Sequence, residues 1–282
     1  MSTMMSFSQK QSTSYLTEED LMKKCPVAFK TSPTNPNVSE KYVHATTIDV
    51  VRDMEKLGWH VVDAKQNRGR KKSAGIRSFH MIAFENPDVK ITKGDDTEAM
   101  VRIILTNSHD GFNSFKFMCG IFRFVCSNGL VVSDMEFANI SIRHINYDFN
   151  ELKNVIQGIF KGLPVVVERM NKMTQITLTE EQKRLLAIEA YKIRKGYDDE
   201  QKVDVDAETI DSILEPVREE DKKDDLWTIF NVCQEKMIRG GFTAKSAKGK
   251  TRKQRSITSI KKDLDMNERF WTAASQFMAV AA

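Results

Sequence analysis

The hydrophobic pattern of this chain changes near Asn150, and that change constrains the fold more than any other feature. Before Asn150, apolar residues alternate with polar residues or form short runs, as at 100–106 and 115–125, which predicts β-strands. After it, apolar residues such as Leu152 and Val155 recur every three or four positions, which predicts helices. A chain that separates its strands from its helices favours an α+β fold with an antiparallel sheet over an alternating parallel fold.

We expect three regions along the 282 residues. Residues 1–40 are predicted to be a flexible N-terminal arm. Residues 41–148 should form a core in which a helix precedes an antiparallel sheet of about five strands. Residues 149–282 should be mainly helical, with an acidic segment at 198–225 and a basic loop at 240–256.

The sequence also bears on the compartment in which the protein works. It has no apolar run near the roughly 18 residues of a membrane-spanning helix, and its N-terminus lacks the apolar core of a signal peptide. We therefore expect a cytoplasmic protein that does not contact a membrane. The cysteines, Cys25, Cys119, Cys126 and Cys233, show no CxxC spacing, which favours buried free thiols over a zinc site or a disulfide framework.

Two stretches of the chain carry basic charge without any acidic residue. They are 65–77 and 236–255, in a chain whose net charge is only +4. Long cations along open loops can follow a phosphodiester backbone and gain affinity by releasing counterions. The alternative is a solvated basic surface that has no partner. The predicted nucleic-acid contacts are Lys65, Arg68, Arg70, Lys71, Lys72, Arg77, Lys245, Lys248, Lys250, Arg252, Lys253 and Arg255.

An acidic stretch lies between the two basic ones. Residues 195–225 contain thirteen acidic and five basic side chains. This segment could be a surface for a protein partner, or it could shield the basic loops within an oligomer. A relaxed P-loop pattern at 244–251 lacks the preceding strand and the following helix that phosphate binding by such a loop requires.

A compact polar turn follows the strand predicted at 101–105. It reads NSHDG at 107–111, and Gly111 is expected to supply a positive φ angle. Phe112 is the best candidate for stacking on an unpaired base. We regard the following residues as the signature of this turn: Asn107, Ser108, His109, Asp110, Gly111, Phe112 and Arg143.

Three histidines fall at or near predicted strand ends. If the strands are neighbours, His80, His109 and His144 could converge with Asp110, bind a metal ion and hydrolyse phosphodiesters. No HxH or HxxxH spacing supports such a site. The alternative is structural: His109 and Asp110 organise the turn through hydrogen bonds to the backbone, and His80 and His144 are half-buried sheet residues.

Several motifs together resemble one known family. They are LGW at 57–59, NSHDG at 107–111, GIFRFVCSNGLVV at 120–132, IRH at 142–144, LWTIFNVCQE at 226–235, RGG at 239–241, Arg255, and NERFW at 267–271. Over roughly residues 40–275 the chain resembles the phage- and plasmid-borne "domain of unknown function 932" family. The resemblance implies an accessory protein of a mobile element in the cytoplasm of an infected host. It assigns no chemistry to the NSHDG turn.

The predicted order of elements is also similar in outline to phage single-strand annealing proteins. That likeness implies a homo-oligomer that holds single-stranded DNA in a basic groove without catalysis. We therefore expect a phage or mobile-element protein that binds single-stranded DNA in replication or recombination, with no catalytic residue and no cofactor. One alternative is a metal-dependent nuclease or phosphoesterase that uses the histidine and aspartate cluster. Another is a counter-defence protein that binds a host factor.

Overall fold

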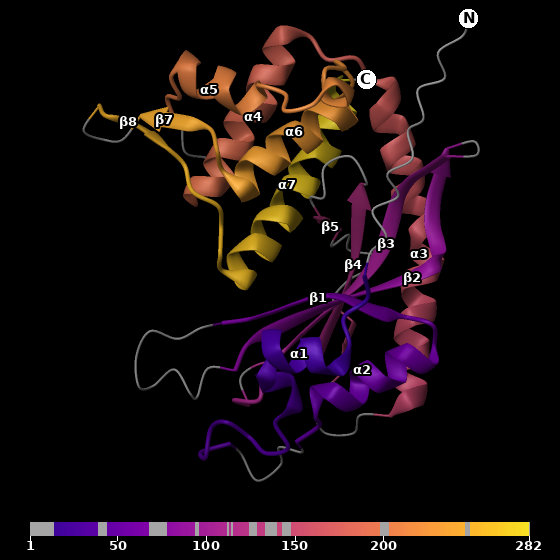
Figure 1. Cartoon of the computed structure of the whole chain (residues 1–282). Coiled ribbons are helices and arrows are strands. Elements are labelled where there is room, and N and C mark those ends of the chain that lie inside the picture. Colours follow the sequence, from indigo (N-terminus) through magenta and orange to yellow (C-terminus); the bar gives the residue numbers. More distant parts are fainter. Residues whose placement is uncertain are drawn as a thin grey trace, which may run out of the picture.

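The structure is a computed structural model, and it places the sheet between two groups of helices. In Figure 1, the N-terminal helices lie on one side of the sheet, most of the C-terminal helices lie on the other, and the long helix α3 (Phe149–Gln175) runs past both. The structure describes residues 14–38, 44–67, 78–93, 96–111, 113, 115–123, 129–132, 140–142, 148–197, 203–245 and 249–281.

The N-terminal helices pack on the sheet. They are α1 (Glu18–Lys24), the short 3-10 helix η1 (Pro26–Phe29) and α2 (Thr47–Lys56). The structure thus contains packed helices within residues 1–40, where the sequence predicts a flexible arm. The sequence signal was present, because Thr17 and Asp20 form a capping box at the start of α1. Leu21 is 1 % exposed and belongs to the core.

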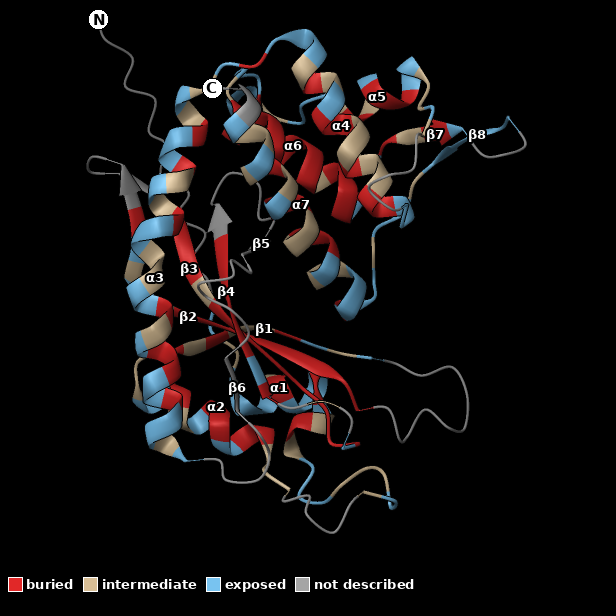
Figure 2. Cartoon of the chain, turned by 180° about the vertical axis from the view of Figure 1, so that it is seen from behind, coloured by how far each residue is buried: buried red, intermediate tan, exposed pale blue. Residues whose placement is uncertain are grey.

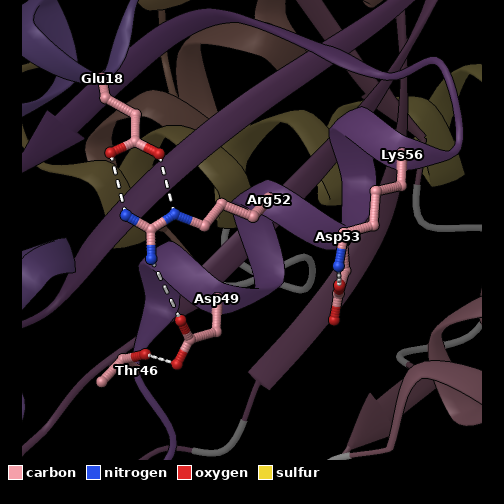
Figure 3. A network of polar contacts seen from close by, with 6 residues as sticks. All are labelled: Glu18, Thr46, Asp49, Arg52, Asp53 and Lys56. Carbon is pink, nitrogen blue, oxygen red and sulfur yellow. Dashed lines mark hydrogen bonds and ion pairs between the residues drawn. The ribbon is translucent and has the colours of Figure 1, made fainter.

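Charged side chains join α1 to α2 (Figure 3). The Arg52 guanidinium donates to both carboxylate oxygens of Glu18, at 2.8 and 3.1 Å, and it also pairs with Asp49 at 3.6 Å. The hydrogen bond from Arg52 lowers the pKa of Glu18. A second contact fixes the other end of this region, where the backbone N–H of Val27 donates to the Gln66 side chain at 3.2 Å. The last residue of the first strand is therefore supported by η1.

Six antiparallel strands form the main sheet. They are β1 (His60–Gln66), β2 (His80–Lys93), β3 (Asp96–Asn107), β4 (Phe115–Arg123), β5 (Gly129–Val132) and β6 (Ile140–Ile142). Their order is β1-β2-β3-β4-β5, and β6 also pairs with β4, at the beginning of that strand and before the part that pairs with β5. The predicted α+β class, with an antiparallel sheet followed by a mainly helical half, is confirmed.

Both faces of the sheet are covered. On β2, Ile82 and Phe84 point into the large core shared with the helices, whereas Met81 and Ala83 belong to a smaller cluster on the opposite face. Ile260, at the start of the last helix, completes that smaller cluster. The buried colouring of the strands in Figure 2 reflects this double coverage. Alternation of two apolar sets is what a strand buried on both faces requires.

The C-terminal half contains α3, α4 (Glu180–Lys195), α5 (Ala207–Leu214), the 3-10 helix η4 (Glu219–Asp221), α6 (Leu226–Arg239) and α7 (Ile260–Ala281). A capping box of Thr179 and Gln182 opens α4, and Gly196 ends it with a φ of +78°. Pro164 lies inside α3, which continues through it. None of the helices in the described part of the chain has the length and apolarity that crossing a membrane requires.

The predicted basic loop at 240–256 contains a small β-hairpin. Its strands are β7 (Thr243–Lys245) and β8 (Thr251–Lys253), paired from Thr243 with Lys253 to Lys245 with Thr251. The hairpin projects from the helical layer in Figure 1. Because Thr251 begins a strand, no helix follows the relaxed P-loop pattern.

Candidate functional site

A buried polar cluster lies where β2 begins and β3 ends. His80 of β2 pairs with Asn107 of β3, and the NSHDG turn continues from that point. Thr47 reaches the same place from the first turn of α2. Every member of the cluster is at most 6 % exposed; the members are Thr47, Ser78, His80, Asn107, Ser108, His109 and Asp110. At this burial each polar group requires a hydrogen-bond partner.

The Thr47 hydroxyl is the centre of the cluster. It lies 2.8 Å from His80 Nε2, 3.3 Å from His109 Nε2 and 2.9 Å from Asn107 Nδ2. His80 Nδ1 is 2.6 Å from the carbonyl oxygen of Ser78, so Nδ1 carries a proton. In the neutral ring, His80 Nε2 then accepts from Thr47. The hydroxyl in turn accepts from Asn107 and from His109 Nε2, which uses its full hydrogen-bonding capacity.

The turn itself is held by hydrogen bonds from three segments. Ser78 Oγ accepts from the backbone N–H of His109 at 2.6 Å, and the Asn107 side chain accepts from the N–H of Ser108 at 2.7 Å. The N–H of Thr34 donates to the His109 carbonyl at 2.7 Å. Gly111 has the expected positive φ, +81°, and an added Cβ would lie 2.9 Å from Val38. Residues 34–38 therefore pack against the turn and cover it.

The structure brings together part of the proposed metal site. The rings of His80 and His109 lie 5.2 Å apart, and His44 adds a third ring 4.7 Å from His109. Asp110 instead accepts a hydrogen bond from Ser108. Within the described residues, no group of three or more histidine, cysteine, aspartate or glutamate side chains is arranged to hold a metal ion. His144, Phe112 and Arg143 lie outside the described residues.

Cations of both predicted basic stretches occur in the described structure. Lys65 is exposed at the end of β1. Five more are exposed on or beside the β7–β8 hairpin: Lys245, Lys250, Arg252, Lys253 and Arg255. The other predicted contacts lie outside the described residues; they are Arg68, Arg70, Lys71, Lys72, Arg77 and Lys248.

The base of the hairpin is anchored by a buried arginine. Arg194, in the last turn of α4, is 6 % exposed and donates to the carbonyl oxygens of Met237 and Arg255. Its guanidinium also lies 5.3 Å from the centre of the Phe242 ring. Burial lowers the pKa of Arg194. The next residue, Lys195, donates to the Gln254 side chain at 3.1 Å.

One cation from each basic stretch acts on the same carboxyl group at the start of α7. Burial raises the pKa of Asp263 in α7, and the charges of Lys65 and Arg239 act in the opposite direction. Cations from the end of β1 and from the end of α6 are thus within electrostatic range of one carboxyl group. Both views place the end of β1 and the hairpin on the same side of the molecule, left in Figure 1 and right in Figure 2.

Further cations complete this surface. Burial lowers the pKa of Lys195, and the nearby charges of Arg194 and Lys262 lower it further. Lys261, also in the first turn of α7, is exposed. We use the term basic face for the exposed cations Lys65, Lys195, Arg239, Lys250, Arg252, Lys253, Arg255, Lys261 and Lys262.

One predicted contact is partly neutralised within the chain. Lys245 lies 3.7 Å from Asp206 and 3.5 Å from Glu208, at the start of α5. The acidic stretch thus pairs with the basic hairpin inside one protomer. We leave Lys245, which pairs with two carboxylates, out of the basic face, and we keep Lys65, which lies 3.8 Å from the single carboxylate of Asp63.

Comparison with known proteins gives the family. The model of the family described as "Domain of unknown function (DUF932)" matches residues 36–271. The chain belongs to the DUF932 family. Two proteins of Escherichia coli strain K12, the UPF0380 proteins YafZ and YfjQ, are each 30 % identical to it over 267 residues. Each alignment covers 93 % of this chain and 92 % of the relative. No solved structure gave a significant match.

Sequence reasoning missed several residues of this DUF932 protein that the structure places at the site. Lys261 and Lys262 had a detectable signal, because the acid-free stretch that begins at 236 continues to Asp263. No sequence signal marked Thr47 and Ser78, since their hydrogen-bond partners in the turn lie far away in the sequence. Lys195 was visible only as a cation in the last turn of a predicted helix.

Proposed function

We propose that this protein binds nucleic acid through the basic face, with single-stranded DNA as the favoured ligand and without catalysis. The setting that we propose is replication or recombination of a phage or mobile element. One observation carries the proposal: the end of β1 and the β7–β8 hairpin, far apart in sequence, lie on the same side of the molecule, and Lys65 and Arg239 are both within electrostatic range of the Asp263 carboxyl group at the start of α7. Cations gathered on one side of a protein can neutralise several phosphates of one strand.

The anchoring of the hairpin supports the same proposal. Exposed cations on a mobile segment lose conformational entropy when they bind, and this loss offsets part of the binding energy. Here Arg194 fixes the hairpin base through two backbone carbonyls, and the buried Phe242 side chain packs beneath it. Arg252 and Lys253 are therefore carried on a fixed base while their side chains remain exposed.

The test is a binding titration over a salt series. The purified protein is mixed with a fluorescent 20-mer of thymidine, a DNA duplex and an RNA of the same length, from 50 to 300 mM KCl. We expect the single strand to bind most tightly. The combined variant Arg252→Gln, Lys253→Gln, Arg255→Gln should reduce the slope of log K against log salt by about two and weaken binding about a hundredfold at 100 mM.

The matched control removes three positive charges elsewhere. Lys153, Lys161 and Lys172 are exposed on α3, which lies across the molecule from the hairpin in both views. Changing all three to glutamine should leave the slope within experimental error. Equal losses in both triple variants would mean that net charge alone drives binding, and the proposed surface would be rejected.

Two other functions predict different outcomes. A metal-dependent nuclease would retain a transition metal after purification and lose it in a His109→Ala variant. A counter-defence protein would show no affinity for any of the three polymers and would retain a host protein instead. The geometry of the cluster does not favour the nuclease, because both ring nitrogens of His80 already have hydrogen-bond partners.

A further inference from the structure

A chain of hydrogen bonds connects the NSHDG turn to the basic face. Ser108 Oγ donates to Asp110 Oδ1, Asn113 Nδ2 donates to Ser108 Oγ at 2.8 Å, and Lys261 Nζ donates to Asn113 Oδ1 at 3.1 Å. Ser108 is fully buried and Lys261 is exposed. The chain therefore runs from the interior of the sheet layer to the surface of α7.

The direction of this chain is fixed by its buried end. At that end the Ser108 hydroxyl donates to Asp110 Oδ1. The Ser108 oxygen then accepts from the amide nitrogen of Asn113, and this leaves Asn113 Oδ1 pointing toward a donor. A lysine ammonium is such a donor, and its charge strengthens the hydrogen bond.

A second contact restrains the same ammonium. Lys261 Nζ lies 4.7 Å from the centre of the Phe79 ring, in the range of a cation–π interaction. Phe79 belongs to the small cluster on the second face of the sheet, together with Ile260 of the same helix turn. An ammonium has three N–H groups, and one donates to Asn113, so two further donors remain for phosphate oxygens.

We infer that Asn113 is a positioning residue for Lys261, and that Lys261 is a phosphate-binding residue of the basic face. The inference rests on the proposed function and extends it, because it gives the NSHDG turn a role in binding. The turn does not touch the ligand. It orients Asn113, and Asn113 holds Lys261 in one place before nucleic acid arrives, which reduces the entropy lost on binding.

The test combines two single variants and their double variant. Lys261→Gln should weaken binding of the thymidine 20-mer about five- to tenfold at 50 mM KCl and reduce the salt slope by about 0.7, as expected for one lost phosphate contact. Lys261→Arg should keep the slope. Asn113→Leu, which removes the acceptor at a half-buried position, should weaken binding about two- to threefold with Lys261 present.

The double variant distinguishes positioning from a general structural effect. With Gln at position 261, Asn113→Leu should cause no further loss of affinity, because the two residues act as one unit. A purely structural defect would weaken binding equally with Lys or Gln at that position, and this result would overturn the positioning role. The thermal midpoint of each variant shows that the protein measured is folded.

The outcomes separate this inference from the proposed function. If the wild-type protein binds with a steep salt slope and Lys261→Gln leaves that slope unchanged, only the inference fails. If the wild-type protein binds none of the polymers, the proposed function fails and the inference fails with it. Lys172→Gln on α3, an exposed lysine paired with Glu168, is the single-charge control and should change neither quantity.

Discussion

The buried polar cluster and the basic face are both rich in hydrogen-bonding side chains, yet they meet opposite demands. In the cluster, Thr47 satisfies three buried partners at once. On the basic face, cations such as Arg252 and Lys253 are exposed to water. Burial makes an unpaired polar group costly, so the polar side chains of the cluster pair mainly with one another. Water can hydrate an exposed cation, so the Lys and Arg side chains of the basic face need no partner within the protein and can donate N–H groups to a ligand. The comparison assigns stability mainly to the first region and binding to the second, and Asn113 links the two through its contacts with Ser108 and Lys261.

The largest effect that tests this division is expected at Thr47. Thr47→Val keeps the side-chain shape and removes the hydroxyl, which leaves three buried polar groups without their shared partner. We expect the free energy of unfolding to fall by about 4 kcal/mol. Urea unfolding provides the measurement. Thr46→Val is the matched control, because Thr46 is partly exposed and contacts only Asp49 among the described side chains; it should cost about 0.5–1 kcal/mol (Figure 3).

The second effect concerns the turn that leads into the hairpin. Gly240 has a φ of +74°, and an added Cβ would lie 2.5 Å from the Gln254 carbonyl oxygen. Gly240→Ala should therefore destabilise the protein by about 3 kcal/mol through strain and collision together. Gly241 also has a positive φ, +87°, but nothing lies within 4 Å of its added Cβ. Gly241→Ala should cost about 1 kcal/mol. Equal midpoints for the two variants in thermal unfolding would mean that Gln254 does not approach Gly240 this closely.

A smaller loss of stability is expected at Arg194, which is buried like the polar cluster but supports the basic face. Its buried guanidinium serves two carbonyls, as in the cluster, yet it supports the binding surface. Arg194→Leu should lower the free energy of unfolding by about 2 kcal/mol and weaken nucleic-acid binding while leaving the salt slope nearly unchanged. Arg184→Leu, on the same helix, removes a partly exposed guanidinium paired with Asp211 and should cost under about 1 kcal/mol. A large change in slope for Arg194→Leu would mean that Arg194 itself contacts phosphate.

The smallest effect is expected from the thiols. Burial raises the pKa of Cys25, Cys119 and Cys233 to about 12 in each case. At pH 8 almost none of these thiols is ionised, so none should react with a thiol reagent until the protein unfolds. Peptide mapping after alkylation identifies which cysteines were modified. Rapid labelling of Cys119 in the folded protein would contradict its burial.

The same shifts determine how stability changes with alkaline pH. The unfolded thiols ionise near 9.0, before the folded ones. The folded state therefore binds more protons above that pH, and the free energy of unfolding falls as the pH rises from about 9 towards 12. Urea midpoints at pH 8 and pH 10 measure the change, and a Cys119→Ala variant should show a weaker dependence.

Much of the fold could be predicted because its signals are local. The capping box at Thr179, the helix stop at Gly196 and the helix at 207–214 each depend on residues a few positions apart, and each is present in the structure. A local rule carries less information at Pro164, because proline in a helix interior can either kink or break the helix. In the structure α3 continues through Pro164, and Val166 and Met170, beyond it, are buried in the core.

The site could not be predicted to the same extent because its contacts are distant in sequence. Lys261 meets Asn113 across 148 positions, and Thr47 meets His109 across 62. Periodicity and spacing report on one element at a time and cannot show which elements face each other. Charge runs did identify the hairpin cations, since such runs mark exposed segments wherever the chain places them.

The packing of residues 34–38 against the NSHDG turn has a consequence for folding during synthesis. These residues and Thr47 leave the ribosome well before Ser78 and the NSHDG turn exist, so their polar groups must stay hydrated during that interval. The buried polar cluster can form only after Asp110, its last member along the chain, has been synthesised. Until then residues 34–38 lack their hydrogen-bond and packing partners in the NSHDG turn. A variant chain without residues 34–38 should be cleaved quickly by proteases even when every strand is present.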